Sequence, residues 1–256
     1  MSDADLEALR GGYEAWNRGD LGAVLALVDP DIDWQPGDEA PESGGGRGRA
    51  GFEQFIASWT ESFEDLQIEP LEFIEIGDHV VTVVHQKGRG RGSGVELEID
   101  TVHVWTIRDG TAVAWTAYRN RDDAIAEVQR DVVRRGYEAL NRGDVEAALE
   151  FLHPEIEWHT YIVPGPGGGV YRGHDGVREL WAEAKRIFGD FRNVPEEMFD
   201  GGDQVVTFVR VEGVGAMSGV AVQARIAHLM TFRGEKIVTV QSFEDRDDAL
   251  RAAGLA

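Results

Sequence analysis

"YEAWNRGD" occupies residues 13–20 and "YEALNRGD" occupies residues 137–144, so seven of eight residues recur 124 positions later. Further pairs of segments repeat at nearly the same offset: "DPDIDW" with "HPEIEW", "GDHVVT" with "GDQVVT", "HVWTIR" with "HLMTFR", and "RDDAI" with "RDDAL". The last three pairs lie 125 apart, so one residue is inserted after Trp158. A unit this long is no solenoid repeat. We therefore expect two tandem domains, residues 1–125 and 126–256.

Composition limits the classes of partner. The chain has 256 residues with a net charge of −22, which repels nucleic acid and anionic membranes. It contains no cysteine, which excludes disulfides and thiolate metal sites and fits a reducing compartment. No apolar run approaches the roughly 18 residues of a membrane span, and the start of the chain lacks a secretory signal pattern. A cytoplasmic protein that binds neither nucleic acid nor membrane is expected.

The repeated octapeptide predicts two helices at the start of each copy. Leu6, Leu9 and Tyr13 are spaced for one helical face. Gly19 is typical of a helix end, and Asp20 is typical of the N-cap of a following helix, "LGAVLALV". The basic stretch "KGRGRGSG", further along the first copy, is interpreted as a hairpin turn.

The rest of each copy predicts strands around one more helix. "DIDW" and "EIEW" alternate polar and apolar residues, so Ile32, Trp34, Ile156 and Trp158 should point inward. A Gly- and Pro-rich segment follows, interpreted as a mobile lid over a pocket, and then a helix at "FEQFIASWTESF" or "VRELWAEAKRIF". The remaining residues read as antiparallel strands. Helices followed by strands indicate the α+β fold class, with a curved, mostly antiparallel sheet wrapped around three helices in each copy.

These motifs resemble a known superfamily. The opening "YEAxNRGD", the strand ending in Trp, "YRGHDGV" before the third helix and "FEDRDDALRAAGL" at the end are similar to SnoaL-like members of the nuclear transport factor 2-like superfamily. The resemblance covers both copies and implies two tandem cone-shaped α+β barrels, each with a pocket between the helices and the concave face of the sheet. The superfamily includes ketosteroid isomerases, polyketide cyclases and members without chemistry, so it predicts fold more sharply than function.

The resemblance can be followed position by position. The first-helix tyrosine of ketosteroid isomerases falls on Gly12 and Gly136, because the tyrosine of each copy is one residue further on, about 100° around the helix. The position of the isomerase base falls on Pro36 and Thr160, neither of which can take a proton from carbon. Isomerase chemistry of that kind is therefore not expected.

A histidine occupies the third position in both copies. The resemblance places His103 and His228 where isomerases carry the acid that binds the oxyanion. Alternation along the strand independently puts His103 on one face with Trp105, and His228 with Met230. Such a histidine can donate a hydrogen bond or act as acid or base, and it can equally be a core residue bonded to a neighbour. Both histidines are candidate catalytic residues.

Two hypotheses for function follow. The first is a pocket protein that binds or transforms an apolar molecule, cyclic ones included, by isomerase, cyclase or hydratase chemistry with a histidine as polar contact. The second is a non-catalytic pseudo-dimeric module with filled pockets. No cofactor is implied. Beside the histidines, the candidate pocket residues are Trp34, Trp105, Trp115, Trp158, Thr160, Tyr171, Trp181, Met230 and Val240.

The two copies differ in bulk. Trp105 corresponds to Met230 and Trp115 to Val240, so the second copy should have the larger cavity. The series of His153, Glu155, Glu157 and His159 has alternate spacing, but it faces away from the inward residues of its strand and predicts no metal site.

The link between the copies and their pairing can also be predicted. Residues 122–140 keep helical spacing without a breaker before Gly136, so the first copy should continue into the first helix of the second. The outer faces of the histidine strands carry apolar residues such as Val104 and Leu229. We expect the two sheets to cover each other within one chain, which makes the protein a monomer.

Overall fold

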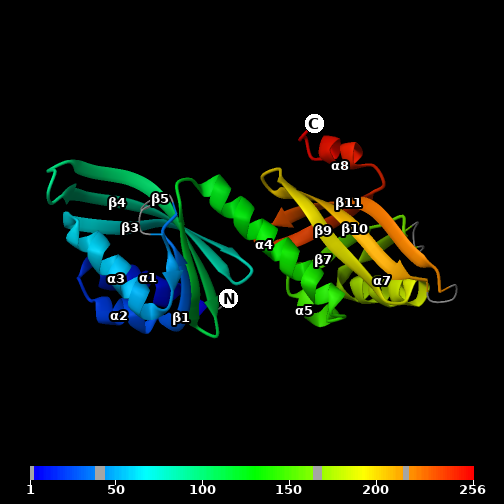
Figure 1. Ribbon diagram of the computed structural model, residues 1–256, viewed down its shortest axis with the longest axis horizontal. Coiled ribbons are helices and arrows are strands. Elements are labelled where there is room, and N and C mark those ends of the chain that lie inside the picture. Colours follow the sequence, from blue (N-terminus) through cyan, green and yellow to red (C-terminus); the bar gives the residue numbers. More distant parts are fainter. Residues whose placement is uncertain (1–2, 38–43, 164–168, 216–218) are drawn as a thin grey trace. The chain divides into compact units, whose positions relative to one another are not determined.

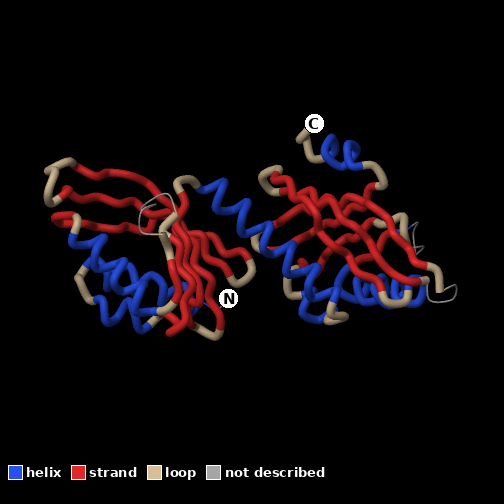
Figure 2. The backbone as a smooth tube through the Cα atoms, in the orientation of Figure 1, coloured by secondary structure: helices blue, strands red, loops and turns tan. Residues whose placement is uncertain are grey.

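The chain folds into two compact units. The structure is a computed structural model that describes residues 3–37, 44–163, 169–215 and 219–256. The units comprise Met1–Glu127 and Val128–Ala256, and each combines helices with one six-stranded sheet (Figures 1 and 2). The predicted α+β class is confirmed, with sheets that are curved and not closed into barrels. Within the described residues, no helix has the length and apolar character needed to cross a bilayer.

The described residues of the first unit form three helices and six strands. The helices are α1 (Asp3–Asn17), α2 (Leu21–Ala26) and α3 (Arg49–Glu61). The strands are β1 (Val28–Gln35), β2 (Gly46–Arg47), β3 (Phe63–Ile76), β4 (His79–Gly90), β5 (Glu96–Arg108) and β6 (Thr111–Tyr118). The sheet order is β2-β1-β6-β5-β4-β3, antiparallel except for the parallel pair β1 and β6.

The second unit repeats this order. Its helices are α4 (Arg121–Asn141), α5 (Val145–Leu149), α7 (Gly173–Phe188) and α8 (Arg246–Ala252). At the offset of 125, α8 corresponds to the first residues of α4. Its strands are β7 (Leu152–His159), β8 (Val170–Arg172), β9 (Phe191–Asp200), β10 (Gln204–Val214), β11 (Ala221–Arg233) and β12 (Lys236–Phe243), in the order β8-β7-β12-β11-β10-β9. As predicted, α4 is unbroken from the end of the first copy into the second.

The repeated octapeptide performs the same structural tasks in both units. Asn17 makes two hydrogen bonds with the backbone of Ile68 on β3, at 2.9 and 2.8 Å, and Asn141 makes the equivalent pair with Asn193 on β9. The aspartate that ends the motif caps the next helix in each copy, as predicted. The glycine before it has a positive φ, 74° at Gly19, which a residue with a Cβ adopts only with strain. The motif thus closes the first helix and ties it to the sheet.

The inward positions of the first strands are confirmed. Ile32 and Ile156 have no exposed surface, and Trp34 and Trp158 are 7% exposed. Arg47 on β2 pairs with Asp33, and Arg172 on β8 pairs with Glu157, so the inserted residue lies between β7 and β8. Within the proposed lid segments, residues 38–43 and 164–168 lie outside the described residues.

One face of the second sheet has a cover that the sequence analysis did not anticipate. Ala227 and Leu229 of β11 pack in one apolar cluster with Ala249 of α8, and Phe208 of β10 completes it. Figure 1 shows α8 on the opposite side of this sheet from α7. The expectation that the other sheet would cover these residues is corrected for this patch: the apolar face of a terminal helix does so.

The predicted hairpin turn is confirmed between β4 and β5. Arg91 in this turn donates to the carbonyl oxygens of Glu61 and Phe63, at 3.0 and 3.1 Å. These carbonyl groups lie at the end of α3 and just beyond it. The basic residue therefore satisfies backbone acceptors that the helix leaves unpaired.

Candidate functional site

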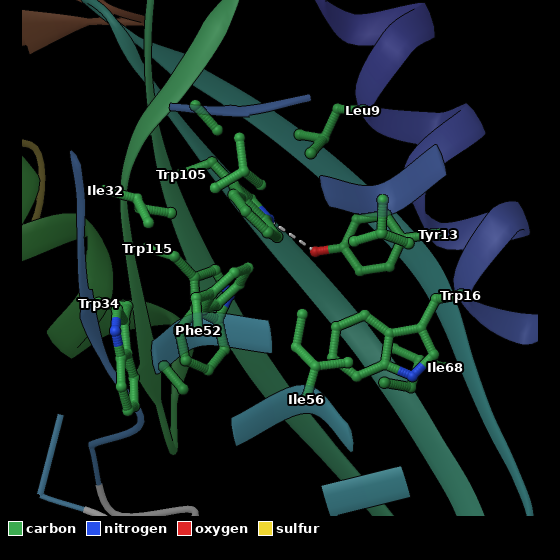
Figure 3. Close-up of a cluster of buried hydrophobic side chains, with 14 of the residues drawn as sticks. Leu9, Tyr13, Trp16, Ile32, Trp34, Phe52, Ile56, Ile68, Trp105 and Trp115 are labelled. Carbon is green, nitrogen blue, oxygen red and sulfur yellow. Dashed lines mark hydrogen bonds between the residues drawn. The ribbon is translucent and has the colours of Figure 1, made fainter. Parts of the chain in front are cut away.

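His103 lies inside the first unit and is held by the first helix. It projects from β5 with 2% of its surface exposed, and its Nδ1 atom is 3.0 Å from the hydroxyl oxygen of Tyr13 on α1. The indole N–H of Trp105 donates to the same oxygen at 2.9 Å (Figure 3). The alternation along the strand predicted that His103 points inward, and its burial confirms this.

Aromatic side chains fill the cone of the first unit. Trp34 stacks on Phe55 at 5.3 Å between ring centroids, and Trp115 lies 5.6 Å from Phe52 and 6.2 Å from Trp105. Figure 3 shows these rings converging between the sheet and the helices. A cavity of about 20 Å³ near Tyr13 is lined by α1, α2 and strand residues but not by His103. Aromatic side chains therefore make up much of the interior of the first unit.

A chain of buried polar groups closes the same cone further along the sheet. The indole N–H of Trp59 on α3 donates to Gln86 Oε1 on β4 at 3.4 Å. The amide of Gln86, 1% exposed, donates to Thr101 Oγ1 on β5 at 2.8 Å. We call Trp59, Gln86 and Thr101 the plug, because they connect the helix to two strands across the interior.

His228 is held in the second unit by a tyrosine. It is 3% exposed on β11, and its Nδ1 atom lies 2.6 Å from the hydroxyl oxygen of Tyr137 on α4. The sequence analysis missed the role of both tyrosines, because it compared their helical phase with a family position and not with the histidine. Their retention in both copies of the octapeptide was the signal that could have identified them.

A cavity borders His228 in the second unit. Its volume is about 60 Å³. It is lined by α7, the strands and the segment after β7, through Trp158, Thr160, Ile162, Val163, Leu180, Trp181, Ala184, Phe188, Phe191, Asn193, Val211, Ile226, His228 and Ser242. Four of the residues predicted for a pocket, Trp158, Thr160, Trp181 and His228, thus line one space.

The cavity occupies the place of the plug. With the offset of 125, Ala184, Val211 and Ile226 correspond to Trp59, Gln86 and Thr101 of the first unit, and all three line the cavity. Where the first unit has Trp59 and Gln86, the second has the smaller Ala184 and Val211. Where the first unit has the hydroxyl of Thr101, the second has the apolar Ile226. These three positions, on one helix and two strands, are among the differences between the two interiors.

Two polar atoms in the cavity wall have no partner among the described residues. They are the indole Nε1 of Trp181 on α7 and the hydroxyl Oγ of Ser242 on β12, and both are buried. Ser242 lies directly opposite His228 in the ladder between β11 and β12. Because a buried polar group without a hydrogen bond costs about 1–3 kcal/mol, these atoms mark a place where a ligand or water gains binding energy.

Burial controls the protonation of the site. It lowers the pKa of His228 from 6.5 to about 4, because the charged imidazolium loses its hydration inside the apolar cone. Burial also raises the pKa of Tyr137. At neutral pH both side chains are uncharged, so the site presents hydrogen bonds and not ionic charge.

The remaining predicted pocket residues lie elsewhere. Met230 and Val240 line a second cavity of about 20 Å³ beside Tyr137, which Trp158 also borders. Tyr171 is buried on β8 opposite Trp158 and is not in the wall of the larger cavity. Trp34, Trp105 and Trp115 belong to the aromatic core of the first unit.

The polar series on β7 lies on the other side of its strand. His159 Nε2 is 3.2 Å from Glu157 Oε2, and Arg172 donates to the other oxygen of that carboxylate at 2.8 Å. In the described part of the chain, no three His, Asp or Glu side chains are arranged to hold a metal ion. This series forms surface ion pairs.

Comparisons with known proteins place the fold. A model of the SnoaL-like domain matches residues 9–115 and again residues 133–240. Similar solved structures include two nuclear transport factor 2-like proteins. That from Burkholderia pseudomallei has 24% identity over 48% of this chain and 94% of its own, with a TM-score of 0.42. That from Burkholderia thailandensis has 27% identity over 49% and 94%, with a TM-score of 0.41.

A third similar structure is TerC, co-crystallized with polyporic acid, with 25% identity over 48% of this chain and 96% of its own and a TM-score of 0.40. A search of curated protein sequences gives no match. The family model alone covers most of both units, with the histidine strand and the repeated octapeptide inside each match. The chain therefore belongs to the SnoaL-like domain family and carries two such domains in tandem.

Proposed function

We propose that the second unit binds a small, predominantly apolar molecule in the cavity beside His228, and that the first unit is a filled copy that serves as scaffold. The observation that carries this proposal is the coincidence of an apolar cavity with unpartnered polar atoms of Trp181 and Ser242. Binding sites for small molecules combine an apolar wall with a few polar groups in this way. His228 is then the polar contact that the histidine phase predicts.

The size and charge of the cavity limit its ligand. A volume of about 60 Å³ holds roughly four to six water molecules or a compact organic group. Among the described residues that line it there is no Asp, Glu, Lys or Arg, and the lowered pKa keeps His228 neutral. An ionic ligand would lose its hydration without gaining a counter-charge. We therefore assign the site to neutral molecules.

The second hypothesis, a module with filled pockets, describes the first unit. The ring centroids of Trp34 and Phe55 lie 5.3 Å apart and those of Trp105 and Trp115 lie 6.2 Å apart, and the plug joins α3 to the sheet. His103 already shares Tyr13 with Trp105 in this core. We therefore assign ligand contact to His228 and a structural role to His103.

A transplant of the plug tests the proposal. The variant Ala184→Trp/Val211→Gln/Ile226→Thr gives the second unit the residues that the first uses at the same positions. The matched control, Trp59→Ala/Gln86→Val/Thr101→Ile, makes the reverse change in the first unit. Binding of cyclohexanone is followed by NMR through the methyl signals of Leu180.

Saturable shifts of these signals are expected in the wild type and in the control, with at least tenfold weaker binding after the transplant. Xenon, which enters dry apolar cavities, serves as a second probe of the volume alone. If the transplant leaves the binding of both probes unchanged, the site lies outside the cavity and the proposal is overturned.

A further inference from the structure

The imidazole of His228 lies between a tyrosine and the cavity. Its Nδ1 atom is bonded to the Tyr137 hydroxyl at 2.6 Å, and Tyr137 lines the smaller cavity but not the larger one. Its Nε2 atom has no hydrogen-bond partner among the described residues. Because the two ring nitrogens point in widely different directions, a bond from Nδ1 to Tyr137 directs Nε2 away from the tyrosine. The ring itself is part of the cavity wall.

The hydrogen bond between Tyr137 and His228 decides which nitrogen carries the proton. The neutral ring has one N–H and one lone pair, and the tyrosine has one O–H donor. If the hydroxyl donates to Nδ1, its proton is satisfied and the ring proton lies on Nε2. If Nδ1–H donates instead, the buried O–H has no acceptor and Nε2 also lacks a donor. Both arrangements leave one donor and one acceptor of the pair without a partner, so the strength of the bond decides between them. A phenol O–H is a stronger acid than an imidazole N–H, and an imidazole nitrogen is a stronger acceptor than a phenol oxygen, so the arrangement in which the hydroxyl donates to Nδ1 has the lower free energy.

The second unit lacks the additional donor of the first. Tyr13 accepts a hydrogen bond from the indole N–H of Trp105, whereas the corresponding residue beside Tyr137 is Met230. The raised pKa of Tyr137 keeps its proton in place as the donor. The Tyr137 hydroxyl therefore donates its one proton to the lone pair on Nδ1 of His228.

Two further polar atoms in the wall of the larger cavity have no hydrogen-bond partner among the described residues. Trp181 Nε1–H can only donate a hydrogen bond, and the hydroxyl of Ser242 can donate or accept. We propose that Tyr137 is a positioning residue that holds His228 as the Nε2–H tautomer, so that the cavity selects neutral ligands carrying a hydrogen-bond acceptor such as a carbonyl or ether oxygen. This inference rests on the proposed binding function and names the chemical class of its ligand.

The tautomer is measured without any ligand. Nitrogen-15 NMR correlations of the imidazole rings distinguish a protonated from an unprotonated Nε2, and His228→Gln assigns the signals. The wild type should show His228 with its proton on Nε2. Tyr137→Phe, which removes the donor, should shift the ring toward a mixture of tautomers, whereas Tyr13→Phe in the first unit should leave His228 unchanged. A proton on Nδ1 of His228 in the wild type would overturn the role of Tyr137.

The ligand class is tested with a matched pair. Cyclohexanone and methylenecyclohexane have the same ring and shape, but only the ketone has an acceptor oxygen. A net hydrogen bond contributes about 1 kcal/mol, so the ketone should bind five- to tenfold more tightly to the wild type. Tyr137→Phe should reduce this ratio, and Tyr13→Phe should not. Cyclohexanecarboxylate, which is charged, should bind more weakly than the ketone.

The outcomes separate the two proposals. Equal binding of ketone and alkene, when both are lost on transplant of the plug, contradicts the ligand class and leaves the binding function intact. A ratio that persists in Tyr137→Phe contradicts the positioning role of the tyrosine. Failure of ketone, alkene and xenon to bind contradicts the binding function and the ligand class together. The tautomer of the free protein decides the role of Tyr137 in every case.

Discussion

The lowered pKa of His228 predicts a specific loss of stability in mild acid. The perturbation is a change from pH 7 to pH 5, compared between the wild type and His228→Gln. Glutamine keeps an acceptor for the Tyr137 hydroxyl and cannot be protonated in this range. Because the pKa falls from 6.5 to about 4 on folding, the unfolded chain binds the proton more tightly than the folded one.

The sign and size of the effect follow from this difference. The contribution of His228 is fully present above pH 6.5 and is lost as the pH falls toward 4. A pKa difference of about 2.5 corresponds to about 3 kcal/mol once the loss is complete. Between pH 7 and pH 5 the expected loss is about 2 kcal/mol, or about twentyfold in the unfolding equilibrium.

Hydrogen exchange measured by mass spectrometry resolves the two units within one sample. Peptides from β10 and β11 report on the second unit, and peptides from α1 report on the first. After correction for the pH dependence of intrinsic exchange, the wild type should lose about twentyfold more protection in β10 and β11 than His228→Gln. Equal losses in the two proteins would show that His228 is hydrated or charged in the folded state and would refute the reasoning.

Further predictions concern the elements around the site. Asn141→Ala removes two hydrogen bonds to the backbone of β9 and should lower the stability of the second unit by about 2 kcal/mol, seen as faster exchange in β9 peptides. Gly143→Ala, at a φ of 78°, should cost about 1 kcal/mol in urea unfolding, and an unchanged midpoint would contradict the strain. Arg246 pairs with Glu196 at 3.1 Å and lies 4.3 Å from the Phe208 ring centroid, so Arg246→Ala should speed exchange in α8 severalfold. Light scattering should show a monomer, and a stable dimer would contradict intramolecular pairing of the repeats.

Much of the fold could be predicted because the chain contains its own alignment. The offset of 124–125 residues matched each helix and strand with a second example, and the alternation on β5 and β11 gave the inward phase of both histidines. These features depend on local periodicity, which one sequence displays. The N-caps and helix ends followed for the same reason, since they depend on a few adjacent residues.

The missed features depend on contacts between distant segments. The bond from Tyr137 to His228 joins residues 91 apart in the chain, and helical phase alone does not show which strand a side chain meets. The apolar cluster beneath α8 depends on the path of the chain after β12, which periodicity does not encode. The plug joins three elements, and no local pattern in the sequence shows that Trp59, Gln86 and Thr101 meet in the interior.

The tyrosine–histidine pair has an evolutionary consequence. Both units carry it, although their cones differ in filling, so parsimony places the pair in the single-copy ancestor before duplication. After duplication, each copy was free to accumulate substitutions that would have been incompatible in one pocket. Trp59, Gln86 and Thr101 of the first copy and Ala184, Val211 and Ile226 of the second are one such set of differences. Reconstruction of the ancestor should therefore recover a histidine already held by its tyrosine, whichever of the two interiors came first.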